Sequence, residues 1–342
     1  MTTLVTGAAG FVGSHVTRQL VARGDQVRVL LRASSTNRAI ADLPLEYVTG
    51  DLREPASLDR AMKGVKRVFH VAADYRLWAR SSQEIYDSNV GGTRNLLSAA
   101  KRAGVERLVY TSTVATVAVD RPQHPNEFTD AKLEEMVGHY KRSKWMAERE
   151  ALEAAKNGLP VIVAMPTTPV GPGDWKPTPT GKIILDFLNG KMPGYVETGL
   201  NFVGVEECAA GHLRVDEKGR VGERYLLGGE NLTLKQMLDT LAKISGLGAP
   251  RLKIPHGLAL GVAYANTAFS RLVGREPSIP VEGVKIARHK MFVDCSRAKR
   301  ELGFQAGPVA AALERAVRWY EANGYIAKSR AKRMAHAAVR VL

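Results

Sequence analysis

The chain has 342 residues, of which 45% are hydrophobic and 24% are charged, and these proportions exclude a disordered tail protein and a fibre. The length predicts two lobes or one large α/β unit. The longest apolar run, residues 257–269, is too short for a membrane span and contains Tyr264 and Asn266, and the N-terminus lacks a secretory pattern. The two cysteines, Cys208 and Cys295, have neither a disulfide framework nor metal-ligand spacing, so we expect a cytoplasmic protein without a metal site.

The excess of positive charge favours an anionic partner. Lys and Arg number 49 against 34 Asp and Glu, a formal net charge of +15. A nucleotide cofactor, a phosphorylated substrate, an anionic membrane face or nucleic acid would each satisfy it. Nucleic acid ranks last, because no recognised binding module is present and part of the excess lies in a tail. The basic residues after Ala327 are Lys328, Arg330, Lys332, Arg333 and Arg340.

Strand-like and helix-like segments alternate through the first half of the chain. Strands are predicted at residues 3–6, 26–31, 45–49, 67–71, 107–111 and 159–164. Helices are predicted between them at residues 11–23, 55–63, 83–103 and 133–157. This alternation predicts a Rossmann fold, a doubly wound parallel α/β sheet covered on both faces.

The pattern changes after Gly171, where a stretch rich in Pro, Gly and Thr is followed by shorter mixed elements. Strands at 202–205 and 224–227 and helices at 234–244 and 308–323 predict a smaller C-terminal α/β substrate lobe. We therefore expect an NAD(P)-binding domain at 1–170, to which later segments can return. A substrate-binding lobe at 171–326 and a basic amphipathic tail at 327–342 would follow.

Three glycines, Gly7, Gly10 and Gly13, stand in TGAAGFVG directly after the first strand, where Phe11 and Val12 open a helix. Such glycines allow a tight turn and a close approach to pyrophosphate, and the helix N-terminus offers free N–H groups. A spaced glycine triplet alone fits an ordinary strand-to-helix turn equally well. The position between the first strand and an amphipathic helix favours dinucleotide binding.

The residues that follow the next strands predict the rest of the nucleotide site. The second strand ends in Arg32, where an NAD-preferring fold usually has an acid. Arg32, with Arg38 as a second contact, suits the 2′-phosphate, so NADP is the preferred cofactor and NAD the alternative; a solvated strand end is the other interpretation of Arg32. His70 is expected to pack in the fourth strand. Further candidates at the cofactor are Asp51, Leu52, Val71, Ala72, Ala73 and Thr111.

Tyr140 and Lys144, in YKRSK, lie on one face of a helix at i, i+4 spacing. A phenol with a pKa near 10 is a poor base, but an adjacent ammonium and an oxidised nicotinamide favour the phenolate. The pair alone is common by chance. Thr113, in TSTVAT after the fifth strand, can offer a hydroxyl to the same substrate oxygen, and Asn89, in NVGGT, precedes both. We therefore predict catalytic roles for Asn89, Thr113, Tyr140 and Lys144.

These motifs, with HVAA, PTTPVGPGD and RAKRELGF, resemble the extended short-chain dehydrogenase/reductases over nearly the whole chain. Within that group, HVAADYRLWA, KPTPTGKI, ETGLN and GERYLLGGENLTL resemble hopanoid-associated sugar epimerases, which are neighbours of the dihydroflavonol 4-reductases. The resemblance implies an NAD(P)-dependent sugar epimerase linked to hopanoid biosynthesis, with Tyr140 as acid/base and Lys144 also holding the nicotinamide ribose. Pro166 and Thr168 would lie along the nicotinamide.

This sequence departs from the family pattern at two places. Thr113 stands where the family usually has Ser, which keeps the hydroxyl. Gly204 and Glu206 stand where relatives often carry His and Asp, so the substrate-lobe contacts are less defined.

Two other functions stay open. An NADPH-dependent ketone reductase is supported by Arg32, whereas a non-catalytic NADP-binding protein would not need the intact Thr113, Tyr140 and Lys144. Val114 and Ala115 disfavour a 4,6-dehydratase, which needs an acid/base pair there. A small sugar or ketone is the expected substrate, although Trp78 and Trp175 would equally fit packing between lobes. Its candidate contacts are Tyr75, Arg76, Trp78, Trp175, Lys176 and Thr178.

The tail predicts an amphipathic helix with a basic face. Such a helix can make weak, salt-sensitive peripheral contact with the inner face of a membrane. The alternatives are docking on the protein itself, docking on the partner subunit of a homodimer, and a solvated, disordered tail. Its apolar stripe is Ala331, Met334, Ala335, Ala338, Val341 and Leu342, and its basic row is Lys328, Lys332, His336 and Arg340.

Overall fold

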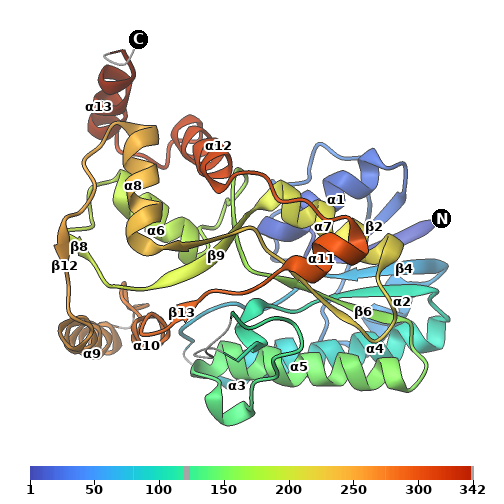
Figure 1. Ribbon diagram of the computed structural model, residues 1–342. Helices are drawn as coiled ribbons and strands as arrows, with labels where there is room; N and C mark the ends of the chain where they lie inside the picture. Colours follow the sequence, from blue (N-terminus) through green and yellow to red (C-terminus); the bar gives the residue numbers. More distant parts are fainter. Residues whose placement is uncertain (80, 119–123, 274, 340–342) are drawn as a thin grey trace.

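A seven-stranded parallel sheet forms the larger part of the molecule in the computed structural model (Figure 1), which describes residues 1–79, 81–118, 124–273 and 275–339. The strand order is β10-β6-β5-β4-β1-β2-β3. Because the order reverses between β1 and β4, the sheet is doubly wound, as the sequence predicts. The strands are β1 (Thr2–Thr6), β2 (Gln26–Leu31), β3 (Glu46–Thr49), β4 (Val65–His70), β5 (Arg107–Thr111), β6 (Val161–Pro166) and β10 (Arg224–Leu227).

Helices cover both faces of this sheet and bury two apolar cores. One face carries α1 (Phe11–Ala22), α7 (Val205–Lys218) and α11 (Ser296–Leu302), and the other carries α2 (Pro55–Met62), α4 (Gly92–Ala103) and α5 (Gly138–Lys156). The helix predicted at 83–103 is interrupted. It consists of α3 (Gln83–Tyr86), a π-helical turn at Asp87–Gly91 and then α4.

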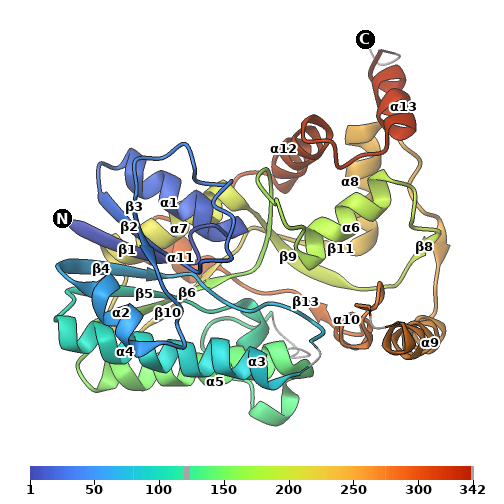
Figure 2. The same ribbon diagram turned by 180° about the vertical axis from the view of Figure 1, so that it is seen from behind.

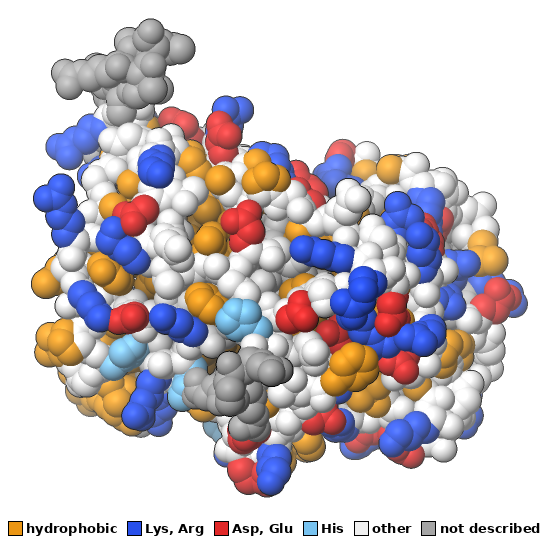
Figure 3. Space-filling model, viewed as in Figure 1, with side chains coloured by type: hydrophobic (Ala, Val, Ile, Leu, Met, Phe, Trp, Pro, Cys, Tyr) orange, Lys and Arg blue, Asp and Glu red, His pale blue; other side chains and the backbone are white. Residues whose placement is uncertain are grey.

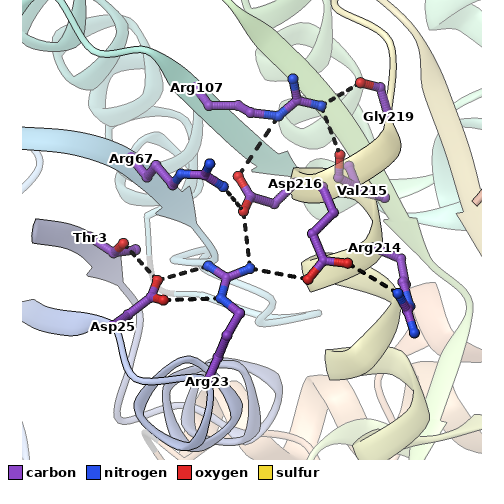
Figure 4. A network of polar contacts seen from close by, with 10 residues as sticks. Thr3, Arg23, Asp25, Arg67, Arg107, Arg214, Val215, Asp216 and Gly219 are labelled. Carbon is purple, nitrogen blue, oxygen red and sulfur yellow. Dashed lines mark hydrogen bonds and ion pairs between the residues drawn. The ribbon is translucent and has the colours of Figure 1, made fainter. Parts of the chain in front are cut away.

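The segment 205–227 returns from the second half of the chain to the large sheet. There β10 pairs in parallel with β6, and α7 lies beside α1. The buried Asp216 of α7 forms ion pairs with Arg23, which follows α1, with Arg67 of β4 and with Arg107 of β5 (Figure 4). A single carboxylate therefore joins α7 to three elements of the first half of the chain.

The smaller lobe is built around short strands and a separate apolar core, which includes Phe187, Leu238, Leu313 and Tyr320. Figure 2 shows α6, α8 and α12 together at the end of the molecule away from the large sheet. Its strands are β7 (Thr168–Val170), β9 (Gly199–Gly204), β11 (Glu230–Thr233) and β13 (Lys290–Met291), with the pair β8 (Gly194–Tyr195) and β12 (Leu252–Lys253). Its helices are α6 (Pro179–Leu188), α8 (Leu234–Ser245), α9 (His256–Leu272), α10 (Val281–Ile286), α12 (Val309–Ala322) and α13 (Lys328–Val339).

The tail forms α13, and the described part of its apolar stripe packs on the protein. Met334 is buried in the core of the smaller lobe, and Ala331 packs against the same core. The Arg330 guanidinium donates to the Leu188 carbonyl over 3.2 Å. Arg340, Val341 and Leu342 lie outside the described residues. This arrangement corresponds to docking on the protein itself, one of the four alternatives. In the described part of the chain, none of the helices is both long and apolar enough to cross a bilayer.

Candidate active site

The glycine turn between β1 and α1 is shaped for close approach of a ligand. Gly7 has φ +73°, and a Cβ there would lie 2.6 Å from the Ala72 nitrogen. The Gly10 N–H donates to the Gly7 carbonyl over 2.9 Å, and α1 begins at Phe11 without a side-chain cap. The first N–H groups of α1 therefore point out of the helix end, an arrangement that suits the binding of an anion. The residues present fit the pyrophosphate of a dinucleotide.

The ends of β2 and β3 are followed by three charged side chains, Arg32, Asp51 and Arg53. Arg32 is exposed, and its charge contributes to a lowered pKa of Asp51, whose main cause is the hydrogen bond from Arg53. The Arg38 guanidinium lies 3.8 Å from the centre of the Trp175 ring. Trp175 lies between β7 and α6 of the smaller lobe, so this contact joins the nucleotide end of the site to that lobe.

Asn89 connects the loop after β4 to the start of α5. Its side-chain oxygen accepts from the Asp74 N–H over 2.7 Å, and its amide donates to the Asp74 carbonyl and to Ser143 Oγ, each over 2.9 Å. Ser143 Oγ in turn donates to the Tyr140 carbonyl over 2.9 Å. Asn89 therefore positions the start of α5, and its predicted catalytic role stays a prediction. The sequence analysis missed Ser143.

Tyr140 lies in the first turn of α5, where its phenol hydrogen-bonds with the Thr113 side chain. Burial raises the pKa of Tyr140, and the hydrogen bond with Thr113 opposes this shift only in part. From the sequence, an adjacent ammonium and an oxidised nicotinamide together are expected to favour the phenolate, and this stays a prediction. Lys144 Nζ donates to the Thr111 carbonyl over 2.7 Å and to the Tyr110 hydroxyl over 3.1 Å.

Lys144 is buried beneath the end of β5. Burial lowers the pKa of its ammonium to about 8, and the charge of Glu148 opposes that shift. Glu148 is also buried, accepts from the Ser112 and Thr116 hydroxyls, and pairs with Arg224 over 3.1 Å. The sequence analysis missed Glu148, although its i, i+4 spacing from Lys144 was an available signal.

A chain of buried polar groups continues from Lys144 across the sheet. The Tyr110 hydroxyl hydrogen-bonds with the Thr93 side chain, whose Oγ1 lies 3.1 Å from His70 Nε2. His70 Nδ1 lies 2.7 Å from Thr6 Oγ1. Burial lowers the pKa of His70 to about 3, so the imidazole is neutral at neutral pH. His70 packs as a neutral strand residue.

Several candidate substrate contacts have partners within the protein. Arg76 pairs with Asp74 over 2.6 Å and with Glu84 over 3.0 Å, and Trp175 packs edge-on against Trp319 with ring centres 4.7 Å apart. Tyr75 is partly exposed and Lys176 is exposed. Their substrate roles, like that of Trp78, stay predictions.

The hydroxyl of Thr178 caps α6 by accepting from the Gly181 N–H, and it donates to the buried Asp174 over 2.8 Å. Asp174 also accepts from the Tyr320 hydroxyl over 3.0 Å, and its charge contributes to a raised pKa of Tyr75. The sequence analysis missed Asp174, which lies between Tyr75 of the larger lobe and α12 of the smaller one.

A doubly wound sheet with a glycine turn at its switch point and a Tyr–Lys pair beside it defines a nicotinamide-dependent oxidoreductase or isomerase. The chain matches the model of the NAD dependent epimerase/dehydratase family over residues 3–228 and belongs to that family. It is an NAD(P)-dependent enzyme.

Similar proteins cover nearly the whole chain. The "Putative dihydroflavonol 4-reductase" of Synechocystis is 44% identical over 94% of this chain and 95% of its own length. The "Sterol demethylase protein B" of Methylococcus capsulatus is 37% identical over 95% of this chain and all of its own length. The crystal structure of gox2253 superimposes with a TM-score of 0.85 at 43% identity, over 95% of this chain and 99% of that one.

Proposed function

We propose that the protein transfers hydride between NADP(H) and a carbinol or ketone carbon, with Tyr140 as the proton donor or acceptor. The hydrogen bond between Thr113 and Tyr140 carries this proposal, because it brings two hydroxyls together just after the carboxyl end of β5. Lys144 is anchored one turn further along α5 by the Thr111 carbonyl. A substrate oxygen at that point would contact both hydroxyls.

The bound cofactor would supply the carbon that gives or accepts hydride. The glycine turn and the start of α1 would hold its pyrophosphate, with Pro166 and Thr168 along the nicotinamide. Thr113 would hold the substrate oxygen. Since burial raises the pKa of Tyr140, the phenol carries its proton at neutral pH and is suited to donate it to that oxygen.

Preference for NADP(H) follows from Arg32, which is exposed at the end of β2 where the 2′-phosphate would lie. Asp51 is the nearby acid, and it is engaged by Arg53 over 2.7 Å. Arg38, held against Trp175, would add a second cation. NAD is the alternative cofactor.

A ketone reductase is therefore the activity we favour, and the relative from Synechocystis carries a reductase name. A sugar epimerase linked to hopanoid biosynthesis is the second candidate, since the family is named for epimerases and the sequence motifs resemble that subgroup. The relative named for sterol demethylation supports a polycyclic lipid as the molecule that carries the ketone group.

The two candidates differ in cofactor stoichiometry. Purified protein would be incubated with NADPH and either polycyclic ketones or nucleotide sugars, and NADPH oxidation would be followed with product analysis. A reductase oxidises one NADPH for each alcohol formed, whereas an epimerase converts its sugar without net NADPH consumption. Epimer formation without NADPH consumption would replace the favoured activity with the second. Failure of Tyr140→Phe to reduce turnover would refute the proton role in either.

A further inference from the structure

The helix α9 presents its most apolar side chains outward. Leu258, Val262, Ala265, Phe269 and Leu272 recur at spacings of four and three, which places them in one stripe along the helix. Leu258 is 62% exposed, Phe269 64% and Leu272 86%. Among the side chains of this helix that the structure describes, the buried ones, Ala263 and Ser270, are small. A helix packed on a soluble protein normally has the opposite arrangement, so this stripe indicates a binding surface.

The segments around the stripe are basic. Residues 249–290 contain seven Lys and Arg but only two acids, Glu276 and Glu282. Figure 3 shows hydrophobic side chains in the region where Figure 1 has α9, with Lys and Arg side chains beside them. The exposed basic residues are Arg251, Lys253, Arg275, Lys285, Arg288 and Lys290, of which Lys253 and Lys290 pair with Glu197.

We propose that the α9 stripe docks the protein on an anionic lipid bilayer, with the apolar side chains in the headgroup region and the basic residues toward the lipid phosphates. Amphipathic helices that lie in a membrane interface combine an apolar face with flanking Lys and Arg. A second copy of the chain fits less well, because a symmetric contact would bring two basic rims together. Both ribbon views place α9 at the outer edge of the smaller lobe, where a flat surface can reach it (Figures 1 and 2).

This surface is connected to the catalytic helix. Helix α9 packs on α10, and Lys285 Nζ of α10 lies 5.9 Å from the centre of the Tyr264 ring. Glu282 of α10 accepts a hydrogen bond from the backbone N–H of His139, the residue before Tyr140. Docking through α9 would therefore hold the mouth of the site next to lipid. The docking surface itself does not depend on which reaction is catalysed.

The test is sedimentation of the full chain with vesicles of phosphatidylglycerol and of phosphatidylcholine. We expect binding to phosphatidylglycerol that weakens between 0.1 and 0.5 M NaCl, because Lys–phosphate attraction is screened. Phe269→Asp with Leu272→Asp should reduce the partition coefficient about tenfold or more, and Leu258→Asp with Val262→Asp should do the same. Val221→Asp is the matched control, since Val221 is 49% exposed and Val262 47%. Near-native circular dichroism and NADPH binding would show that each variant is folded.

Three results would overturn the proposal. The first is the absence of wild-type binding to phosphatidylglycerol vesicles at low salt. The second is binding that survives both stripe variants but is lost in Lys328→Glu with Arg333→Glu, which would assign it to the tail. The third is a wild-type dimer, detected by light scattering, that the stripe variants convert to monomers, which would make the stripe a subunit interface.

Discussion

Tyr140 and Lys144 lie one helical turn apart but contact different groups, and this separates their expected contributions. Tyr140 contacts Thr113, whereas Lys144 is anchored to Thr111 and Tyr110. Tyr140→Phe should lower turnover by about 10² to 10⁴ and leave NADPH affinity within a few-fold, because the phenol is proposed to transfer the proton and not to hold the pyrophosphate. Lys144→Met should lower both turnover and NADPH affinity. Steady-state kinetics and fluorescence titration would measure them, and near-normal turnover of Tyr140→Phe would mean that another residue supplies the proton.

Arg32 should decide between the two nicotinamide cofactors. Arg32→Asp removes the cation proposed to meet the 2′-phosphate and adds an acid that suits a ribose diol. We expect a loss of NADPH affinity of about tenfold or more, with NADH affinity unchanged or improved. Titration of both cofactors would measure it. Arg60→Asp, at an exposed position of α2, controls for the change in net charge. Equal or tighter NADPH binding by Arg32→Asp would contradict the assignment.

Lys141 is a buried cation whose Nζ lies 3.8 Å from the Met291 sulfur, a weak acceptor. Burial lowers its pKa to about 8 from a normal value of 10.5. Between these two pH values the unfolded chain binds more protons than the folded chain, so this group makes the free energy of unfolding rise with pH from about 8 to 10.5. Below pH 8 its full destabilising effect is present.

Lys141→Met should therefore increase the free energy of unfolding at pH 7 by about 1 to 3 kcal/mol. The gain should shrink as the pH approaches 10.5. Urea unfolding at pH 7 and pH 10 would measure it, with Lys156→Met, at an exposed position, as the control. A variant less stable than wild type at pH 7 would show that the ammonium has a stabilising partner.

At the scale of elements, the first half of the chain is predictable because its signals are local. Alternation of buried strands with amphipathic helices is sufficient to place β1 to β6, within about two residues at their ends. The helices α6 and α9 were not predicted, and the first turn of α6 follows a run rich in Pro and Thr. The return of β10 to the large sheet depends on pairing with β6, about 60 residues away, and no local pattern specifies that partner.

For the candidate site, too, residues in local motifs could be predicted and residues brought together by distant contacts could not. Gly7, Thr113 and Tyr140 belong to motifs whose spacing carries their geometry. The partners of Asn89 could not be predicted from a motif, because Asp74 and Ser143 contact it only in the folded chain. The direction of the Lys144 ammonium likewise depends on the buried Tyr110 hydroxyl, which a helical-face argument does not include.

Asp216 is the point at which α7 depends on the first half of the chain. It is 1% exposed and faces Arg23, Arg67 and Arg107 (Figure 4). Asp216→Asn would leave three cations without their shared carboxylate and should lower the free energy of unfolding by about 3 to 5 kcal/mol. Glu217→Gln, at the half-exposed neighbouring position, should change it by less than about 1 kcal/mol. Urea unfolding would compare them, and equal effects would remove the special role of the buried carboxylate.

For the whole molecule, contacts between distant segments complete both lobes. The contact of Arg38 with Trp175 joins the larger lobe to the smaller one, and α13 packs on the core of the smaller lobe. The tail helix is therefore a part of the smaller lobe and not a free appendage. If its basic side chains bind an anion, they do so while the helix stays docked on the smaller lobe.

Met334 holds α13 in that position, because it is the buried side chain of the helix among those described. Met334→Asp would put a charge into an apolar core, and the low-cost response is release of the terminal helix while the rest of the lobe stays folded. We expect faster backbone hydrogen exchange across residues 328–339 and little change in the midpoint of global unfolding. Arg333→Asp, at the adjacent exposed position, is the matched control and should leave exchange unchanged. Exchange in Met334→Asp as slow as in wild type would show that α13 is held by its other contacts, among which is the hydrogen bond from Arg330 to the Leu188 carbonyl.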